Sequence, residues 1–188
     1  MAVSAFIAQR AFAVTIFDNR GALKGGTEVV DGGNINGWWG QAFATTASAT
    51  NVTEVVLSMS NANATTSFSV DIYSSLEGNQ PGSLLQTIYT GTPGQFFSPF
   101  TINQLNVPLS ASTEYFVVVA PTVGGLDWDF TNATTGRNAN SLDQAVSWSS
   151  ATSAPLQMSV VAVPEPATVG LLATAGFAGG ISLIRRRR

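Results

Sequence analysis

Short runs of β-branched and aromatic residues, separated by Gly, Asn, Pro and Ser, recur along most of the chain. In Ser67–Ser74 apolar and polar residues alternate, so Phe68, Val70 and Ile72 point to one face and the residues between them to the other. This period of two is typical of a half-buried antiparallel strand that is wet on one side. The pattern predicts strands at 14–18, 39–45, 52–59, 67–74, 84–89, 97–107, 114–120, 126–131, 145–148 and 156–162.

The segment that carries these runs is polar and lacks a helical period. Ser, Thr and Asn make up 47 of the 150 residues from Val14 to Val163, which is too polar for a helical bundle. Turn residues fill the connections, as in Glu77–Gly82, and Ala133–Ser141 is polar enough to be a loop. Ten short strands at this spacing predict an all-β domain, an antiparallel β-sandwich of jelly-roll type.

Composition and charge exclude several kinds of chemistry. The 188 residues include no Cys and no His, which rules out disulfides, Cys/His zinc sites and catalytic triads that need His. The segment from Val14 to Val163 has ten acidic residues against only Arg20, Lys24 and Arg137. Such a body repels phosphate backbones, so we expect no nucleic-acid partner. No cofactor is expected, and Lys24, in a Gly-rich stretch, is expected in a solvated turn.

The C-terminus has a membrane-segment pattern. Residues Ala167 to Ile184 carry no charge, and a helix of that length spans about 27 Å, close to the hydrocarbon thickness of a bilayer. A basic tail follows, formed by Arg185, Arg186, Arg187 and Arg188. By the positive-inside rule this tail stays cytoplasmic and the preceding domain lies outside. A buried core helix with a basic tail is the alternative, but it would show a polar face.

Immediately before this span stands Val163-Pro164-Glu165-Pro166. The two prolines predict an extended, exposed tether that is neither helix nor strand. The order of motif, apolar span and arginine cluster resembles the PEP-CTERM sorting signal of bacteria that make exopolysaccharide. The resemblance implies that a membrane-embedded exosortase recognises Pro164, Glu165 and Pro166, cleaves nearby, and releases or re-anchors the domain outside the inner membrane.

The N-terminus is read as the remnant of a signal peptide. Ala11-Phe12-Ala13 has the small-x-small form of a cleavage site, but the preceding apolar run is short and Arg10 interrupts it. We interpret 1–13 as a signal peptide truncated by a start codon placed too far downstream; a frayed or strand-forming start is the alternative. The predicted organisation is therefore 1–13 signal remnant, 14–162 β domain and 163–188 sorting signal, with motif 163–166, helix 167–184 and tail 185–188.

A second resemblance covers the β domain. The stretches that carry it are Phe17-Asp18-Asn19, Gln41-Ala42-Phe43, Phe68 to Tyr73, Pro81 to Leu85 and Leu109 to Phe116. Together they are similar to the choice-of-anchor surface domains, in particular the R type, which occur with alternative sorting signals. The family usually has Trp after Tyr in the last of these motifs, whereas Phe116 follows Tyr115 here. The resemblance implies a fold and a surface location and says little about chemistry.

Two features suggest alternatives with a ligand or a reaction. Asp127-Trp128-Asp129 places two carboxylates on one strand face about 7 Å apart, which suits a glycosidase pair or, with Asp31 or Asp143, a calcium site. The structural alternative is two exposed carboxylates around an inward Trp. Trp39 and Trp128 are candidate sugar contacts by ring stacking, although tryptophan in a sandwich is more often core.

The sequence therefore predicts an exported, non-enzymatic protein of the cell surface or extracellular matrix, associated with exopolysaccharide and sorted by an exosortase. No catalytic or metal-binding residue is assigned. Its precursor is expected to be anchored in the inner membrane by the C-terminal helix before the domain reaches the surface or matrix. A carbohydrate-binding module and a carbohydrate-active enzyme are the alternatives.

Overall fold

The computed structural model describes residues 12–31, 37–61, 65–77, 79–132 and 136–164. Within these ranges there are fourteen strands and no helix, and every strand pairing is antiparallel. This confirms the prediction of an all-β domain. The strands are β1 (Val14–Asp18), β2 (Lys24–Asp31), β3 (Trp38–Ala44), β4 (Ala49–Leu57), β5 (Met59–Ser60), β6 (Ser67–Leu76), β7 (Gln80–Gly91), β8 (Phe100–Ile102), β9 (Val107–Pro108), β10 (Glu114–Val123), β11 (Gly125–Thr131), β12 (Asn138–Ser141), β13 (Ser149–Ala151) and β14 (Met158–Pro164).

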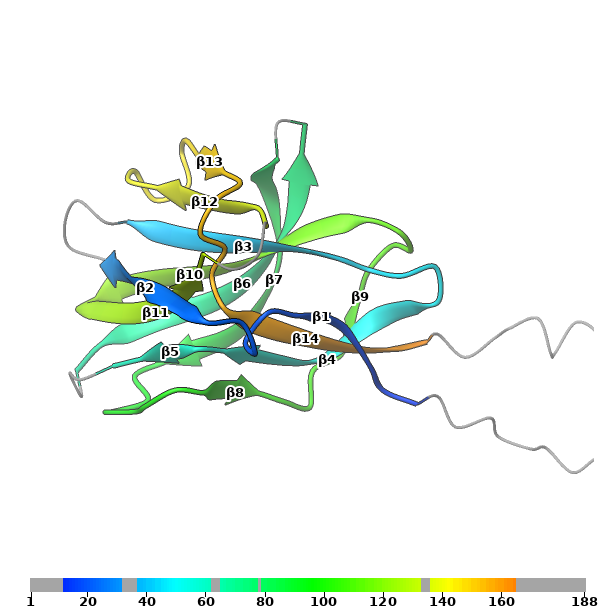
Figure 1. The fold of residues 1–188 in the computed structure, drawn as a ribbon, viewed down its shortest axis with the longest axis horizontal. Coiled ribbons are helices and arrows are strands. Elements are labelled where there is room, and N and C mark those ends of the chain that lie inside the picture. Colours follow the sequence, from blue (N-terminus) through cyan, green and yellow to red (C-terminus); the bar gives the residue numbers. More distant parts are fainter. Residues whose placement is uncertain (1–11, 32–36, 62–64, 78, 133–135, 165–188) are drawn as a thin grey trace, which may run out of the picture.

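The strands are arranged in three sheets. The first has the order β1-β14-β4-β8, with β9 also paired to β4; the second is β13-β12-β3-β10-β6-β7; the third is β2-β11-β5. In Figure 1 β1, β14 and β8 of the first sheet lie below β3 and β12 of the second. Because β1 pairs with β14, the first and the last strand of the domain are neighbours.

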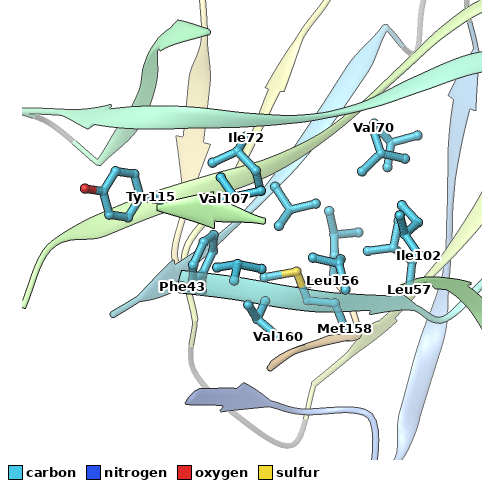
Figure 2. Packing of buried hydrophobic residues seen from close by; sticks show 14 of the residues in the cluster. Phe43, Leu57, Val70, Ile72, Ile102, Val107, Tyr115, Leu156, Met158 and Val160 are labelled. Carbon is cyan, nitrogen blue, oxygen red and sulfur yellow. The ribbon is translucent and has the colours of Figure 1, made fainter. Parts of the chain in front are cut away.

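One large hydrophobic cluster joins the three sheets. Val160 of the first sheet, Ile72 of the second and Trp128 of the third all belong to it and are fully buried. Figure 2 shows Met158 and Val160 of β14 pointing into the same space as Ile72. Each buried side chain of this size contributes about 1.5–3 kcal/mol, so packing stabilises the domain without disulfides.

A second, smaller cluster covers the other face of the six-stranded sheet, where the sequence predicts a wet surface. The loop after β12 brings Trp148 over this face, where its ring meets Tyr73 edge-on at 6.2 Å between centroids. Gln80 holds the loop there by donating a hydrogen bond to the Trp148 carbonyl at 2.9 Å. Tyr73 is therefore buried, as is Asp71 two residues before it, and the prediction of a wet face is wrong at these two positions. The cluster consists of Ala42, Tyr73, Phe116, Val118 and Ala139, with Trp38 and Trp148 packed against it.

The predicted strands differ from the observed ones mainly in polar or glycine-rich segments. β2 was missed: it begins at Lys24, which was expected in a solvated turn and instead pairs with Asp129 at 2.6 Å. β12 lies within the predicted loop 133–141. The polar side chain of Asn138 is accommodated there because it donates hydrogen bonds to the Ser153 and Ala154 carbonyls. The predicted strand 145–148 is instead a turn, in which Gln144 and Ala145 have positive φ. Turn 77–82 is shorter than predicted, because β7 already begins at Gln80.

Candidate functional site

The chain that leads into β14 is fixed by side-chain amides. Gln41 is fully buried, and its Oε1 accepts a hydrogen bond from the Leu156 N–H at 2.8 Å. Asn19 Nδ2 donates to the Leu156 carbonyl at 3.0 Å, and Asn19 Oδ1 accepts from the Met158 N–H at 2.8 Å. Asn138 Nδ2 donates to the Ala154 carbonyl at 2.8 Å. Because unpaired buried backbone groups are costly, these amides determine where β14 begins.

The end of β14 is the described part of the sorting motif. Val163 pairs with Asn51 and Pro164 with Ala49, so the strand continues through the first proline of the motif. Both Val163 and Pro164 are half-buried. The sequence predicts an exposed tether that begins at Val163 and is not part of a strand. This prediction is therefore wrong for Val163 and Pro164. Pro164 is tolerated because it is the last strand residue and the register shifts just before it.

Several segments without charge meet where β14 ends. β4 begins there, and the chain through β9 to the start of β10 runs alongside it, with the Leu109 N–H donating to the Thr50 carbonyl at 3.1 Å. Thr45 Oγ1 donates to the Ser110 carbonyl at 2.7 Å, and the Ser110 N–H donates to the Tyr115 hydroxyl at 2.9 Å. We call this the neutral end of the domain; it comprises residues 45–53, 103–113 and 162–164, none of which is ionisable.

The neutral end is hollowed by an open pocket of about 580 Å³. Its lining is small and uncharged, formed by Ala47, Ser48, Thr50, Pro108, Leu109, Ser110 and Ala111. Leu109, Ser110 and Ala111 come from the segment between β9 and β10. The pocket contains no acid, base or nucleophile pair that points to a reaction.

The two candidate sugar contacts differ in position. Trp128 is fully buried, and its Nε1 donates to the Gln157 carbonyl at 3.0 Å. Its ring presents no face to solvent, so Trp128 is not available to stack on a sugar in the folded domain. Trp39 is half-buried against the main cluster, while the adjacent Trp38 packs on the second cluster. The successive tryptophans therefore do point to opposite faces of the sheet, as the sequence predicts.

The carboxylates beside Trp128 match the structural alternative only in part, because the tryptophan points inward but only one of the two carboxylates is exposed. Asp127 is exposed and Asp129 is half-buried in its ion pair with Lys24, with the tryptophan inward between them. Asp143 lies on a loop of another sheet, where it accepts a hydrogen bond from the Ser141 hydroxyl at 2.8 Å. In the part of the chain that the structure describes, no three acidic side chains gather as a metal site requires.

Several predicted elements lie outside the described residues. These are Glu165 and Pro166 of the motif, the apolar segment 167–184, and the tail Arg185, Arg186, Arg187 and Arg188. Residues 1–11 of the predicted signal remnant are also outside, whereas β1 begins at Val14, directly after the predicted cleavage site. The described ranges contain no helix that could cross a membrane.

Comparison with known proteins supports the C-terminal assignment. The family described as "PEP-CTERM protein-sorting motif" matches residues 162–188. No curated protein and no solved structure matches the chain. The match begins at Ala162, inside β14, so the sorting signal and the folded domain share Ala162, Val163 and Pro164. It indicates an exported precursor that transits the membrane and is processed by an exosortase.

Proposed function

We propose that this protein is a non-enzymatic component of the cell surface or extracellular matrix, whose β domain is delivered by its C-terminal sorting signal. The observation that carries the proposal is the continuity between the domain and the signal at Pro164. A domain whose last strand ends inside the processing motif is suited to be released or re-anchored as a whole. The lack of ionisable residues in 45–53 and 103–113, which lie beside this strand end, and the Lys24–Asp129 ion pair also favour a structural role.

Two finer assignments belong to the same proposal. The β domain is of the choice-of-anchor R type and the exported form associates with exopolysaccharide. The stretch Leu109 to Phe116 supports the first, because it forms a bonded corner in which Tyr115 anchors Ser110. The polar surface of Ser, Thr and Asn supports the second, since it offers many hydrogen-bonding groups without adding charge to an acidic body.

The test is a truncation that leaves the domain whole. A stop codon after Pro164 keeps every described strand, whereas one placed earlier would remove part of β14. In the native host we expect the 1–164 form to leave the membrane fraction and to miss its normal destination. An unchanged distribution between membrane, surface and medium would contradict the proposal.

A point variant tests recognition of the motif separately. Glu165→Ala should leave an unprocessed form in the inner membrane, detected by intact mass. Glu54→Ala, which removes a carboxylate from β4 without touching the motif, is the matched control and should be processed normally.

The enzymatic alternative is tested with Asp127→Asn and Asp129→Asn in one chain. If the native chain degrades a polysaccharide of a test panel and the double variant does not, the protein has a catalytic role and the proposal is wrong.

A further inference from the structure

We propose that the neutral end of the domain rests on the outer surface of the membrane in the unprocessed precursor. This inference rests on the proposed function, in which residues 167–184 span the bilayer. It adds a membrane-contacting surface to the protein, made of the segments that surround the end of β14. Its partner is a lipid surface rather than a second protein.

The length of chain between the domain and the span carries the inference. Pro164 is still paired with Ala49, and only Glu165 and Pro166 separate it from Ala167, where the apolar segment starts. Three residue steps cover at most about 10 Å in extended chain. The headgroup layer on each side of a bilayer is itself about 5–7 Å thick. The strand end therefore reaches the headgroups as long as β14 stays paired.

The chemistry of the neutral end is compatible with that position. A surface pressed against lipid loses water, which is costly for an unpaired charge but tolerable for hydroxyl and amide groups that bond to headgroups. The neutral end offers Ser, Thr and Asn and no ionisable group. By contrast, the Val14–Val163 segment as a whole has ten acidic and three basic residues.

The nearest carboxylates on the flanking strands stand back from the strand end. Glu54 pairs with Val161, about 10 Å from Pro164 along the strand, and Asp18 pairs with Ser159, about 17 Å from it. At physiological salt the screening length is about 8 Å, so these charges do not prevent contact with anionic lipid. In the second sheet Glu114 is paired with Arg137 at 2.6 Å.

The N-terminal side of the domain meets the same end. Val14 opens β1 and pairs with Ala162, so the chain enters the domain beside the point where it leaves. Figure 1 shows the start of β1, the end of β14 and the β3–β4 turn together at one end of the molecule. A signal peptide before Val14 and a membrane span after Pro166 would thus hold the same face against the bilayer.

The test uses the full chain in lipid vesicles and exploits the absence of native cysteine. A fluorescent dye is attached to Ala47→Cys or Ala111→Cys at the neutral end, or to Thr92→Cys at the opposite end as the matched control. All three positions are exposed. The vesicles contain zwitterionic and anionic lipids and a lipid with a nitroxide on its headgroup. We expect several-fold stronger quenching at positions 47 and 111 than at position 92.

A spacer variant shows whether the short connection is the cause. A flexible Gly/Ser insert of about 15 residues between Pro164 and Glu165 adds an r.m.s. distance of about 20 Å and leaves β14 intact. Quenching at position 47 should then fall to the level of position 92. Equal quenching at both ends of the unmodified chain, or no effect of the spacer, would overturn the inference.

The proposed function and this inference fail in distinguishable ways. If the full chain does not float with the vesicles in a density gradient, the membrane span of the proposed function is absent. If it floats but position 47 is not quenched, only the membrane-contacting surface is wrong. Crosslinking of Ala47→Cys to the exosortase in cells, without quenching by lipid in vesicles, would assign the neutral end to a protein contact and overturn the lipid surface.

Discussion

Single amide side chains decide where the last strand of this domain lies. Gln41, Asn19 and Asn138 each bond to the backbone of residues 154–158, a stretch that has no regular partner strand over most of its length. None of the three is marked in the sequence as a core residue, because amides are more often exposed. Their role becomes visible only when segments far apart in the chain meet, as Gln41 and Leu156 do.

Replacement of Gln41 tests this role. Gln41→Leu keeps a side chain of similar size that can stay buried, but the buried Leu156 N–H loses its acceptor. We expect a loss of about 1–3 kcal/mol in the free energy of unfolding, measured by urea denaturation of the 1–164 form. Gln86→Leu, at an exposed position of β7, is the control and should change little. Equal stability of the two variants would show that the amide is not needed.

Asp143 provides a prediction about pH. Hydrogen bonds from the Ser147 side chain and backbone and from the Ser141 hydroxyl lower the pKa of its carboxyl to about 2. A carboxyl whose pKa is lowered on folding contributes stability above its unfolded value, near 3.8, and loses it as the pH falls through the folded value. The stability difference between the native chain and Asp143→Ala should therefore be constant near neutral pH and shrink progressively as the pH falls below about 4, with a small part still present at pH 2.

Chemical denaturation at a series of pH values measures this difference. Asp127→Ala, which removes an exposed carboxylate on β11, is the control. Because Asp143 is fully exposed, the expected effect is small, and it concerns the loop after β12 rather than the main core. A difference between native chain and variant that is as large at pH 2 as at neutral pH would contradict the assignment.

At the scale of elements, strands rich in apolar residues could be predicted from the sequence, whereas polar and glycine-rich strands could not. β1 was predicted with its observed bounds, and β10, β11 and β14 within a few residues, because β-branched or aromatic residues recur in all four. β2 and β12 escaped prediction because glycines and amides carry no such pattern. The extension of β14 to Pro164 was also missed, although the run Val160-Val161-Ala162-Val163 leads directly to it. The jelly-roll connectivity stays a prediction.

The loop that places Trp148 over the six-stranded sheet allows a prediction at the scale of elements. Burial raises the pKa of Tyr73, and the charge of Asp71 adds to the effect. Trp148→Ala removes the ring that packs on Tyr73 and should expose its hydroxyl, so the Tyr73 pKa should fall toward its usual value. Spectrophotometric titration of the tyrosines measures this shift, with Trp148→Phe as the control that keeps an aromatic cover. An unchanged titration curve in Trp148→Ala would show that other residues bury Tyr73.

At the scale of the whole molecule, the described domain fits closely between two segments that the sequence assigns to export. β1 begins at Val14, directly after the predicted signal cleavage site at Ala13, and β14 ends at Pro164 within the sorting motif. The sequence predicts the motif because its three parts stand in order. It could not predict that the domain and motif overlap, because the pairing of Pro164 with Ala49 depends on a strand more than a hundred residues away.

This overlap limits where the exosortase can cut without damaging the domain. A cut before Ala162 would remove a fully buried core residue, and with it the pairing of β14 to the first residues of β4 and to Val14 of β1. We therefore expect the mature protein, examined by intact mass from the native host, to end at or after Pro164 and to lack the arginine tail. Recombinant chains ending at Pro164 and at Val160 provide the matched comparison. The shorter one should unfold at a lower temperature, because four paired strand residues are missing from the centre of the first sheet. A mature species that ends inside β14, or equal stability of the two recombinant chains, would show that the last strand residues belong to the signal and not to the domain.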